Sequence, residues 1–289
     1  MPCQQENTAL RQHFRTRRRL AALTVVLGLL LLGKGAADTP ASAEVELWRL
    51  DCGEFVDFPL NVASDSFAYP GQTKTLTDSC YLIRHNAEYM LWDTGFRPSE
   101  LKAKADGARV ETLVQQLARI AVAPESVTFV GISHFHWDHT GQASLFPGAR
   151  LLIGEPDFEL LVRGAQYGQR DDIGPWLTNT AKVDRVVADK DVFGDGTVVM
   201  LATPGHTPGH HSLLIRLKEF GTVILSGDLW HFTEQVSHNG IPPYNADRAA
   251  TLASMDRILK AAANLKAKII IQHEPADIDK LPSFPSSVK

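Results

Sequence analysis

The chain has 289 residues, with 29 basic and 33 acidic side chains and a formal net charge of −4. Six of the basic and two of the acidic residues fall within the first 43, so the remainder carries about −8. No run of lysine and arginine occurs in that remainder, which argues against a nucleic acid as substrate. Residues 44–289 show no linker-like segment, low-complexity tract or repeat, so we expect one domain.

The N-terminal segment, residues 1–43, resembles a secretory signal peptide. Five arginines precede an apolar run at 20–32, and the small residues at 41–43 suit a signal peptidase. The run is shorter than the roughly 20 residues that span a bilayer, so a retained membrane anchor is the weaker alternative. The order TRRRL at 16–20 also resembles a twin-arginine signal, and both export routes stay open. We expect a periplasmic or secreted protein with no membrane span after cleavage.

Nine short runs rich in β-branched and aromatic residues predict strands, and two longer runs have helical periodicity. The predicted strands are 45–50, 80–84, 89–92, 127–132, 150–153, 198–202, 211–216, 222–225 and 268–271, and the predicted helices are 110–120 and 248–265. The early strands follow one another as hairpins, whereas the later ones alternate with helices. This order predicts an α/β chain with sheets packed face to face and helices outside.

Residues 133–141 read SHFHWDHTG and place three histidines and an aspartate within six positions. The stretch begins where the predicted strand 127–132 ends, at a sheet edge of the kind where functional residues are often found. Four more predicted strands are each followed by a polar residue of the same types, namely Asp93, His206, Asp228 and His273. Each of these strand ends offers a candidate ligand.

Seven side chains are candidate metal ligands, and their imidazoles and carboxylates both suit zinc. They are His134, His136, Asp138, His139, His206, Asp228 and His273. A tetrahedral ion needs four ligands, so seven ligands predict two ions that share one of them. A carboxylate has two oxygens and can bridge, which favours Asp228 as the shared ligand.

These motifs resemble the metallo-β-lactamase superfamily, whose signature is the His-x-His-x-Asp-His loop, over essentially all of residues 44–289. The resemblance implies an α/β hydrolase domain with a four-layer αββα sandwich and two Zn²⁺ ions, although other divalent transition metals fit the same donors. It assigns one ion to His134, His136 and His206, the other to Asp138, His139 and His273, and the bridge to Asp228. It also implies that Asp93 orients a ligand histidine from behind.

From the expected pair of zinc ions we predict a hydrolase that acts on a small molecule with an ester-like bond. Zinc lowers the pKa of bound water to about 7, so a hydroxide held between the ions is the expected nucleophile. The ions would stabilise the developing oxyanion, and we expect Asp138 to pass a proton to the leaving group.

Within the superfamily the pieces LDCG, DSCYLIRH, DTG, SHFHWDHTG and GDLWH resemble the N-acyl homoserine lactonases, which open the lactone ring of quorum-sensing signals. True β-lactamases have cysteine or serine in place of Asp228, and glyoxalase II needs glutathione-binding helices beyond its last metal histidine, where 16 residues follow His273. The chain departs from the lactonases at His231, where the best-known members have tyrosine. An imidazole can still donate a hydrogen bond, so His231 is a candidate catalytic residue.

Two alternatives to a lactonase stay open. A methyl-parathion-hydrolase-like enzyme would use the same site on phosphotriesters, and the histidine at 231 is compatible with it. A zinc-binding protein without turnover is disfavoured, because a storage site does not need both Asp138 and Asp228.

For several residues the sequence is compatible with two roles. Cys52 and Cys80 can form a disulfide in an oxidising compartment or remain as two buried thiols. The apolar side chains between 154 and 193 can line a groove for an acyl chain or belong to the core; they are Phe158, Leu160, Leu161, Tyr167, Ile173, Trp176 and Leu177. Of the remaining histidines, His210 and His211 favour packing or hydrogen-bonded strand positions, and His85 and His238 resemble surface or loop residues. The sequence does not indicate an oligomeric state.

Overall fold

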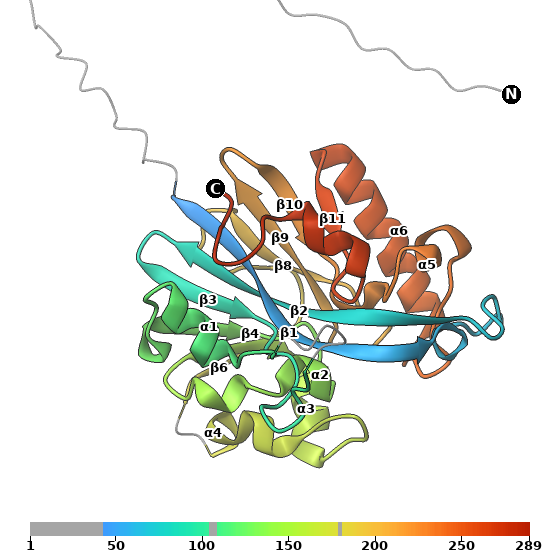
Figure 1. Ribbon diagram of the computed structural model, residues 1–289, viewed down its shortest axis with the longest axis horizontal. Helices are drawn as coiled ribbons and strands as arrows, with labels where there is room; N and C mark the ends of the chain where they lie inside the picture. The colour runs from blue at the N-terminus through green and yellow to red at the C-terminus, as the bar shows by residue number, and fades with distance from the viewer. Residues whose placement is uncertain (1–42, 104–108, 179–180) are drawn as a thin grey trace, which may run out of the picture. The chain divides into compact units, whose positions relative to one another are not determined.

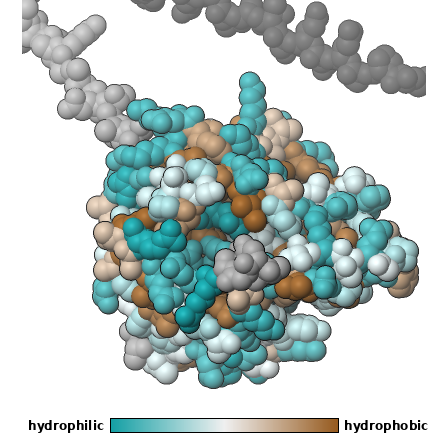
Figure 2. All heavy atoms as spheres, in the orientation of Figure 1, coloured by the Kyte–Doolittle hydropathy of each residue, from teal (hydrophilic) through white to brown (hydrophobic). Residues whose placement is uncertain are grey.

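The computed structural model describes residues 43–103, 109–178 and 181–289. The predicted signal peptide, apart from Ala43, lies outside these residues. Within the described ranges no helix is long and apolar enough to cross a membrane. On the face drawn in Figure 2, hydrophobic residues of the described part form small patches among hydrophilic ones.

The first sheet has six strands in the order β1-β2-β3-β4-β5-β6. They are β1 (Val45–Pro59), β2 (Thr73–His85), β3 (Glu88–Trp92), β4 (Val127–Gly131), β5 (Arg150–Gly154) and β6 (Val183–Val186). Pairing is antiparallel from β1 to β3 and parallel from β3 to β6. The carboxyl ends of β3, β4 and β5 therefore meet at one edge, which carries Asp93 and the 133–141 motif.

The second sheet has five strands in the order β11-β10-β9-β8-β7. They are β7 (Lys190–Asp191), β8 (Val198–Ala202), β9 (His211–Leu217), β10 (Gly221–Leu225) and β11 (Lys268–Ile270). Strands β10 and β11 are parallel, and the other pairs are antiparallel. Because β8, β10 and β11 run in the same direction, the residues that follow them, His206, Asp228 and His273, come to the same edge.

Helices cover both outer faces of the two sheets. They are α1 (Leu113–Arg119), α2 (Trp137–Thr140), α3 (Glu155–Arg163), α4 (Gly174–Leu177), α5 (Glu234–His238) and α6 (Arg248–Leu265). Short 3₁₀ turns occupy η1 (Leu60–Ala63), η2 (Pro124–Ser126), η3 (Ala143–Leu145), η4 (Arg170–Ile173), η5 (Gly227–Leu229) and η6 (Pro275–Lys280). Figure 1 shows α1 to α4 on one side of the strands and α5 and α6 on the other.

Three hydrophobic clusters separate these layers. One lies between the two sheets and contains Tyr81, Trp92 and Ile215, and the others pack helices against the outer face of each sheet. Burial of both faces explains why the strands read as nearly continuous hydrophobic runs. The predicted four-layer αββα sandwich is confirmed.

The helix predicted at 248–265 matches α6, whose N-terminus is capped by the side chain of Asp247. The helix predicted at 110–120 is shorter, because Thr112 and Gln115 form a capping box that starts α1 at Leu113. The expected alternation of the later strands with helices was wrong for β7 to β10, which are joined as antiparallel hairpins without an intervening helix.

The segment between 154 and 193 belongs mainly to the core. It forms α3, η4, α4, β6 and β7. Phe158, Leu161, Ile173 and Trp176 are buried in the cluster on the outer face of the first sheet, and Leu160 and Leu177 pack against it. Tyr167 differs from these residues because it is exposed and lines a pocket beside the candidate site. Of the seven apolar residues considered in this segment, Tyr167 is therefore the one placed to line a groove for an acyl chain.

Cys52 and Cys80 form a disulfide between β1 and β2, with their Cα atoms 5.8 Å apart. A Cβ on Gly95, whose φ is +61°, would lie 2.2 Å from the Cβ of Cys52, so glycine is required at this position. The disulfide is thus packed against the loop after β3 that carries Asp93. Asp93 itself has a φ of 57°, a conformation that non-glycine residues adopt only where their surroundings hold them.

Candidate metal centre

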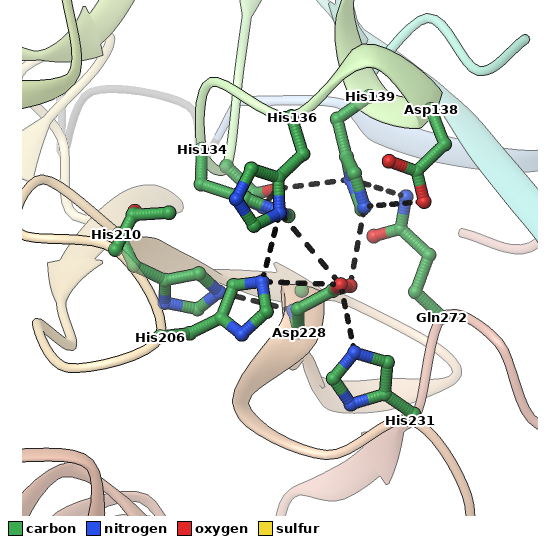
Figure 3. Close-up of polar contacts among 12 residues, drawn as sticks. His134, His136, Asp138, His139, His206, His210, Asp228, His231 and Gln272 are labelled. Atoms are coloured by element: carbon green, nitrogen blue, oxygen red, sulfur yellow. Dashed lines mark hydrogen bonds and ion pairs between the residues drawn. The ribbon is translucent and has the colours of Figure 1, made fainter. Parts of the chain in front are cut away.

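The structure brings all seven predicted ligands together at the shared edge of the two sheets. One group comprises His134, His136, His206 and Asp228, and the other comprises Asp138, His139, His273 and Asp228, with the ligand atoms of each group within 4.8 Å of one another. Figure 3 shows the carboxylate of Asp228 in the middle, with imidazoles pointing toward it from several sides. Asp228 is the one residue common to both groups, as a bridging ligand would be.

Loop geometry places Asp228 in this central position. Gly227 has a φ of +56°, and a Cβ there would lie 2.7 Å from Nε2 of His210. The same Nε2 accepts a hydrogen bond of 3.0 Å from the backbone N–H of Asp228. Nδ1 of His210 lies 2.8 Å from the hydroxyl of Thr203, so the ring is held at both ends. His210 is therefore a buried hydrogen-bonded residue that supports the loop, and it lies just before β9 rather than in a strand.

Three of the candidate ligand histidines are also held on the side away from the centre. Nδ1 of His139 lies 3.1 Å from the carboxylate of Asp93, and Nδ1 of His273 donates to the backbone carbonyl of Thr77 at 2.9 Å. Nδ1 of His206 lies 2.8 Å from Oδ1 of Asn245. Such contacts fix the ring orientation and leave the other nitrogen for a metal. The predicted position of Asp93 beside a ligand histidine agrees with this geometry.

The residues present fit a pair of metal ions. Nε2 of His134, His139 and His273 and Oδ1 of Asp228 are buried and make no hydrogen bond with the described residues. Nε2 of His139 and Nε2 of His273 lie 3.2 and 3.1 Å from Oδ1 of Asp228, at ion-pair distance. Buried polar atoms are normally satisfied, so four such atoms facing one another need a shared partner. Imidazole nitrogens and carboxylate oxygens are the donors that zinc accepts.

The two groups differ in their electrostatics. Burial holds the pKa of His134 and of His136 well below the usual value and lowers the pKa of His206 to about 3. These three imidazoles are therefore uncharged and can donate a nitrogen lone pair to a metal ion. Burial also opposes the charge on His273, but Asp228 raises its pKa to about 9. The pKa of Asp228, which burial would raise, is held well below its ordinary value by the surrounding imidazoles, His139 first.

His231 points into the site rather than away from it. Its Nε2 lies 3.2 Å from Oδ2 of Asp228, and the residue is 5% exposed. The hydroxyl of Tyr244 lies 3.3 Å from the same nitrogen. Tyr244 was not predicted from the sequence, because a tyrosine in the loop between α5 and α6 follows no strand and matches no motif.

A pocket opens above the ligand groups and reaches Asp138, His231 and Tyr244. Its apolar wall is formed by Phe55, Phe58, Val62, Leu76, Trp137 and Tyr167. A second pocket shares Phe55, Phe58 and Trp137 with the first. Its further lining includes the apolar Pro59 and Phe96 and the charged Glu54, Glu100 and Lys102. The site is therefore a polar centre at the end of an aromatic groove.

Besides His210 and His231, three histidines of the described ranges lie outside the candidate ligand groups. His211 hydrogen-bonds to backbone carbonyls, as expected for a strand residue, and His238 is exposed at the end of α5. His85 was predicted to be a surface or loop residue, but it is buried at the end of β2. It pairs with Asp195 and stacks on Phe193 with ring centroids 4.0 Å apart, which explains its burial.

The sandwich and the paired ligand groups at its edge define a metal-dependent hydrolase. A family model described as the Metallo-beta-lactamase superfamily matches residues 75–273. The chain belongs to the metallo-beta-lactamase superfamily.

Among curated proteins, the chain is similar to the N-acyl homoserine lactonase AttM of Azorhizobium caulinodans, with 30% identity over 182 residues, 60% of this chain and 67% of AttM. An N-acyl homoserine lactonase from a Bacillus species is 28% identical over 222 residues, 71% of this chain and 84% of that protein.

Solved structures show the same fold. An N-acyl homoserine lactone hydrolase with the product N-hexanoyl-L-homoserine bound at its catalytic metal centre superposes with a TM-score of 0.70 at 22% identity, covering 85% of this chain and 99% of that one. AidC, a dizinc quorum-quenching lactonase, superposes with a TM-score of 0.61 at 20% identity, covering 84% of this chain and 90% of that one.

Proposed function

We propose that this hydrolase opens the lactone ring of N-acyl homoserine lactones and so quenches quorum-sensing signals. The observation that carries the proposal is the aromatic groove that ends at the two ligand groups. An acyl homoserine lactone has an ester at one end and an apolar chain at the other, which matches a polar centre and an adjoining apolar wall. The names of the similar curated proteins support the same substrate class.

The reacting ester would lie beneath Phe55 and Trp137, whose ring centroids are 5.9 Å apart. Phe55 also packs edge-on against His273 at 5.6 Å, so the apolar wall reaches the second ligand group itself. These rings would exclude water from one side of the lactone and bury the first carbons of its chain.

We assign the two metal positions to zinc, held by the seven predicted ligands with Asp228 shared between them. When bound, the two ions supply a water activated for attack near neutral pH and Lewis-acid polarisation of the ester carbonyl. The burial that keeps His134, His136 and His206 neutral leaves their nitrogens free to act as ligands.

Two side chains of the pocket have further proposed roles. Asp138 borders the pocket, and its carboxylate would pass a proton to the departing alkoxide of the opened ring. His231 would donate a hydrogen bond to the carbonyl oxygen as negative charge develops on it. The contact between His231 and Tyr244 would hold this imidazole in place.

The test compares the zinc-loaded protein on N-hexanoyl homoserine lactone and on an aryl dialkyl phosphate, with acid release as the common readout. A kcat/KM at least tenfold higher for the lactone supports the proposal. The second candidate is a phosphotriesterase, because residue 231 is histidine and not the tyrosine of the best-known lactonases. A higher kcat/KM for the phosphate would favour this second candidate. A protein that binds two zinc ions and hydrolyses neither compound contradicts both.

We also propose that residues 1–43 direct export and are removed, which leaves a periplasmic or secreted enzyme. The arginine-rich start and the apolar run support this, and a disulfide between Cys52 and Cys80 fits an oxidising compartment. Expression of the full chain in a bacterium, followed by fractionation and N-terminal sequencing, tests it. A new N-terminus at Glu44 in the exported fraction is expected, and an intact N-terminus in the cytoplasm would contradict it.

A further inference from the structure

Asp157 is a fully buried carboxylate in the first turn of α3, just after β5. Its Oδ1 accepts a hydrogen bond of 2.6 Å from the backbone N–H of Gly209. Its Oδ2 accepts one of 3.2 Å from the backbone N–H of Phe135 and one of 2.6 Å from the hydroxyl of Thr207. Both oxygens of this side chain therefore serve as acceptors for three donors.

The three donors belong to the two loops that carry the imidazoles of the first ligand group. Phe135 lies between two of these histidines in the loop after β4, and Thr207 directly follows His206 in the loop after β8. The two loops come from different sheets. Asp157 therefore ties together two segments whose separation sets the distance between the imidazoles.

The contact between α3 and the loop after β8 is close enough to require glycine on both sides. A Cβ on Gly209 would lie 2.8 Å from Cγ of Asp157, and a Cβ on Gly154 would lie 2.0 Å from the carbonyl oxygen of Gly209. A small shift of this loop would therefore be transmitted to the neighbouring His206 without a flexible side chain to absorb it.

The second ligand group is supported by different residues. His139 is contacted by Asp93, and His273 is held by the carbonyl of Thr77. A change at Asp157 should therefore act on one half of the centre.

We propose that Asp157 is a positioning residue that fixes the geometry of His134, His136 and His206 and thereby sets the zinc affinity of the first ligand group. The inference rests on the metal-binding part of the proposed function and is independent of the substrate. The substitution that isolates it is Asp157→Asn. It preserves shape but places an amide NH₂ against a backbone N–H of either Gly209 or Phe135, which leaves one of these donors without an acceptor.

The experiment measures zinc affinity by chelator competition on the full chain in two backgrounds. In His273→Ala, where the second group is disabled, Asp157→Asn should weaken the remaining ion by about 10-fold to 100-fold. In His206→Ala, where the first group is disabled, the same substitution should change the affinity of the remaining ion less than twofold. Equal weakening in both backgrounds, or none in either, would overturn the inference.

The matched control is Asp195→Asn, which removes a carboxylate that also receives three hydrogen bonds, from Thr197 and His85, away from both ligand groups. It should leave both zinc affinities unchanged. If Asp157→Asn does not fold, Thr207→Val carries the test, because it removes one of the three bonds and should give the same selective weakening, with Thr207→Ser restoring the affinity. An unchanged affinity in Thr207→Val would then overturn the inference. Failure of the unsubstituted chain to bind zinc would instead refute the metal centre itself.

Discussion

At the scale of single residues, the contact between His231 and Tyr244 distinguishes this site. The imidazole sits between the carboxylate of Asp228 and the phenol of Tyr244, within 3.3 Å of each through one nitrogen. Its other nitrogen, Nδ1, is buried and has no hydrogen-bond partner among the described residues. The nitrogen that faces the candidate metal centre is therefore Nε2, and this atom is the one that would donate a hydrogen bond to a substrate carbonyl there.

The first prediction is that His231→Ala lowers kcat on a lactone by up to about 100-fold while both zinc ions remain bound, because a single preorganised oxyanion donor is worth this much. Steady-state kinetics at measured metal occupancy check it. His231→Tyr should keep or raise lactonase activity, since a phenol also donates. If His231→Ala leaves kcat and KM unchanged at full occupancy, the residue has no catalytic role.

The second prediction concerns pH and the zinc-free protein. Burial raises the pKa of Asp157 from 3.8 to about 7, although its three hydrogen bonds oppose the rise. Between pH 5 and 7 the unfolded chain has already lost this proton while the folded chain retains it, so the free energy of unfolding falls as the pH rises. The protonated carboxyl can be accommodated because the hydroxyl of Thr207 can turn and accept its proton.

Urea unfolding at pH 5, 6 and 7 provides the measurement. The decline in the free energy of unfolding should be shallower in Asp157→Asn, by at most about 1.4 kcal/mol per pH unit. Every other ionisable group is the same in both proteins, so the comparison isolates position 157. Parallel pH profiles would show that Asp157 is already ionised in the folded chain at pH 5.

At the scale of elements, the ends of strands carry the ligands, and the sequence predicts this part of the site well. A buried strand is a hydrophobic run, so a histidine or aspartate directly after it is conspicuous. Residues such as Asn245, Tyr244 and Thr77 were missed for the opposite reason. They act through a loop position or a backbone carbonyl, and only the folded chain brings them beside His206, His231 and His273.

The β1–β2 pair extends beyond both predicted strands. Residues 73–79 read TKTLTDS, a polar stretch that pairs with β1 mainly through its backbone and therefore lacks a hydrophobic signal. This extension carries the Thr77 carbonyl that holds His273, and the opposing part of β1 carries Phe55 of the groove. The disulfide crosses the pair at its centre.

The third prediction is that reduction of the Cys52–Cys80 bond lowers the free energy of unfolding by roughly 3–4 kcal/mol, because the bond closes a segment with a sequence separation of 28. Urea unfolding of the zinc-free protein with and without reductant measures this. The same reductant should not move the transition of the Cys52→Ala/Cys80→Ala variant. A wild-type transition that is insensitive to reductant would mean that the bond contributes nothing to stability.

At the scale of the whole molecule, the sandwich places the edges of the two sheets that carry the candidate ligands next to each other. The first sheet contributes the ligands that follow β4, and the second contributes those that follow β8, β10 and β11. The resemblance to a known superfamily predicted this architecture, whereas periodicity alone predicted only two sheets with helices outside. Strand β6 was missed because it reads VDRV, with two charged residues in place of a hydrophobic run, and β7 was missed because two residues are too few to show a pattern.

We propose that two metal ions, with Asp228 as their shared ligand, make this chain a hydrolase. Titration of the metal-free protein with zinc, with lactone hydrolysis followed at each step, tests it most directly. We predict about two ions per chain and activity that appears as the sites fill, and Asp228→Ala should fold normally but lose the shared site and most turnover. A stoichiometry near zero with full hydrolytic activity, or wild-type turnover in Asp228→Ala, would contradict catalysis by a dinuclear metal centre.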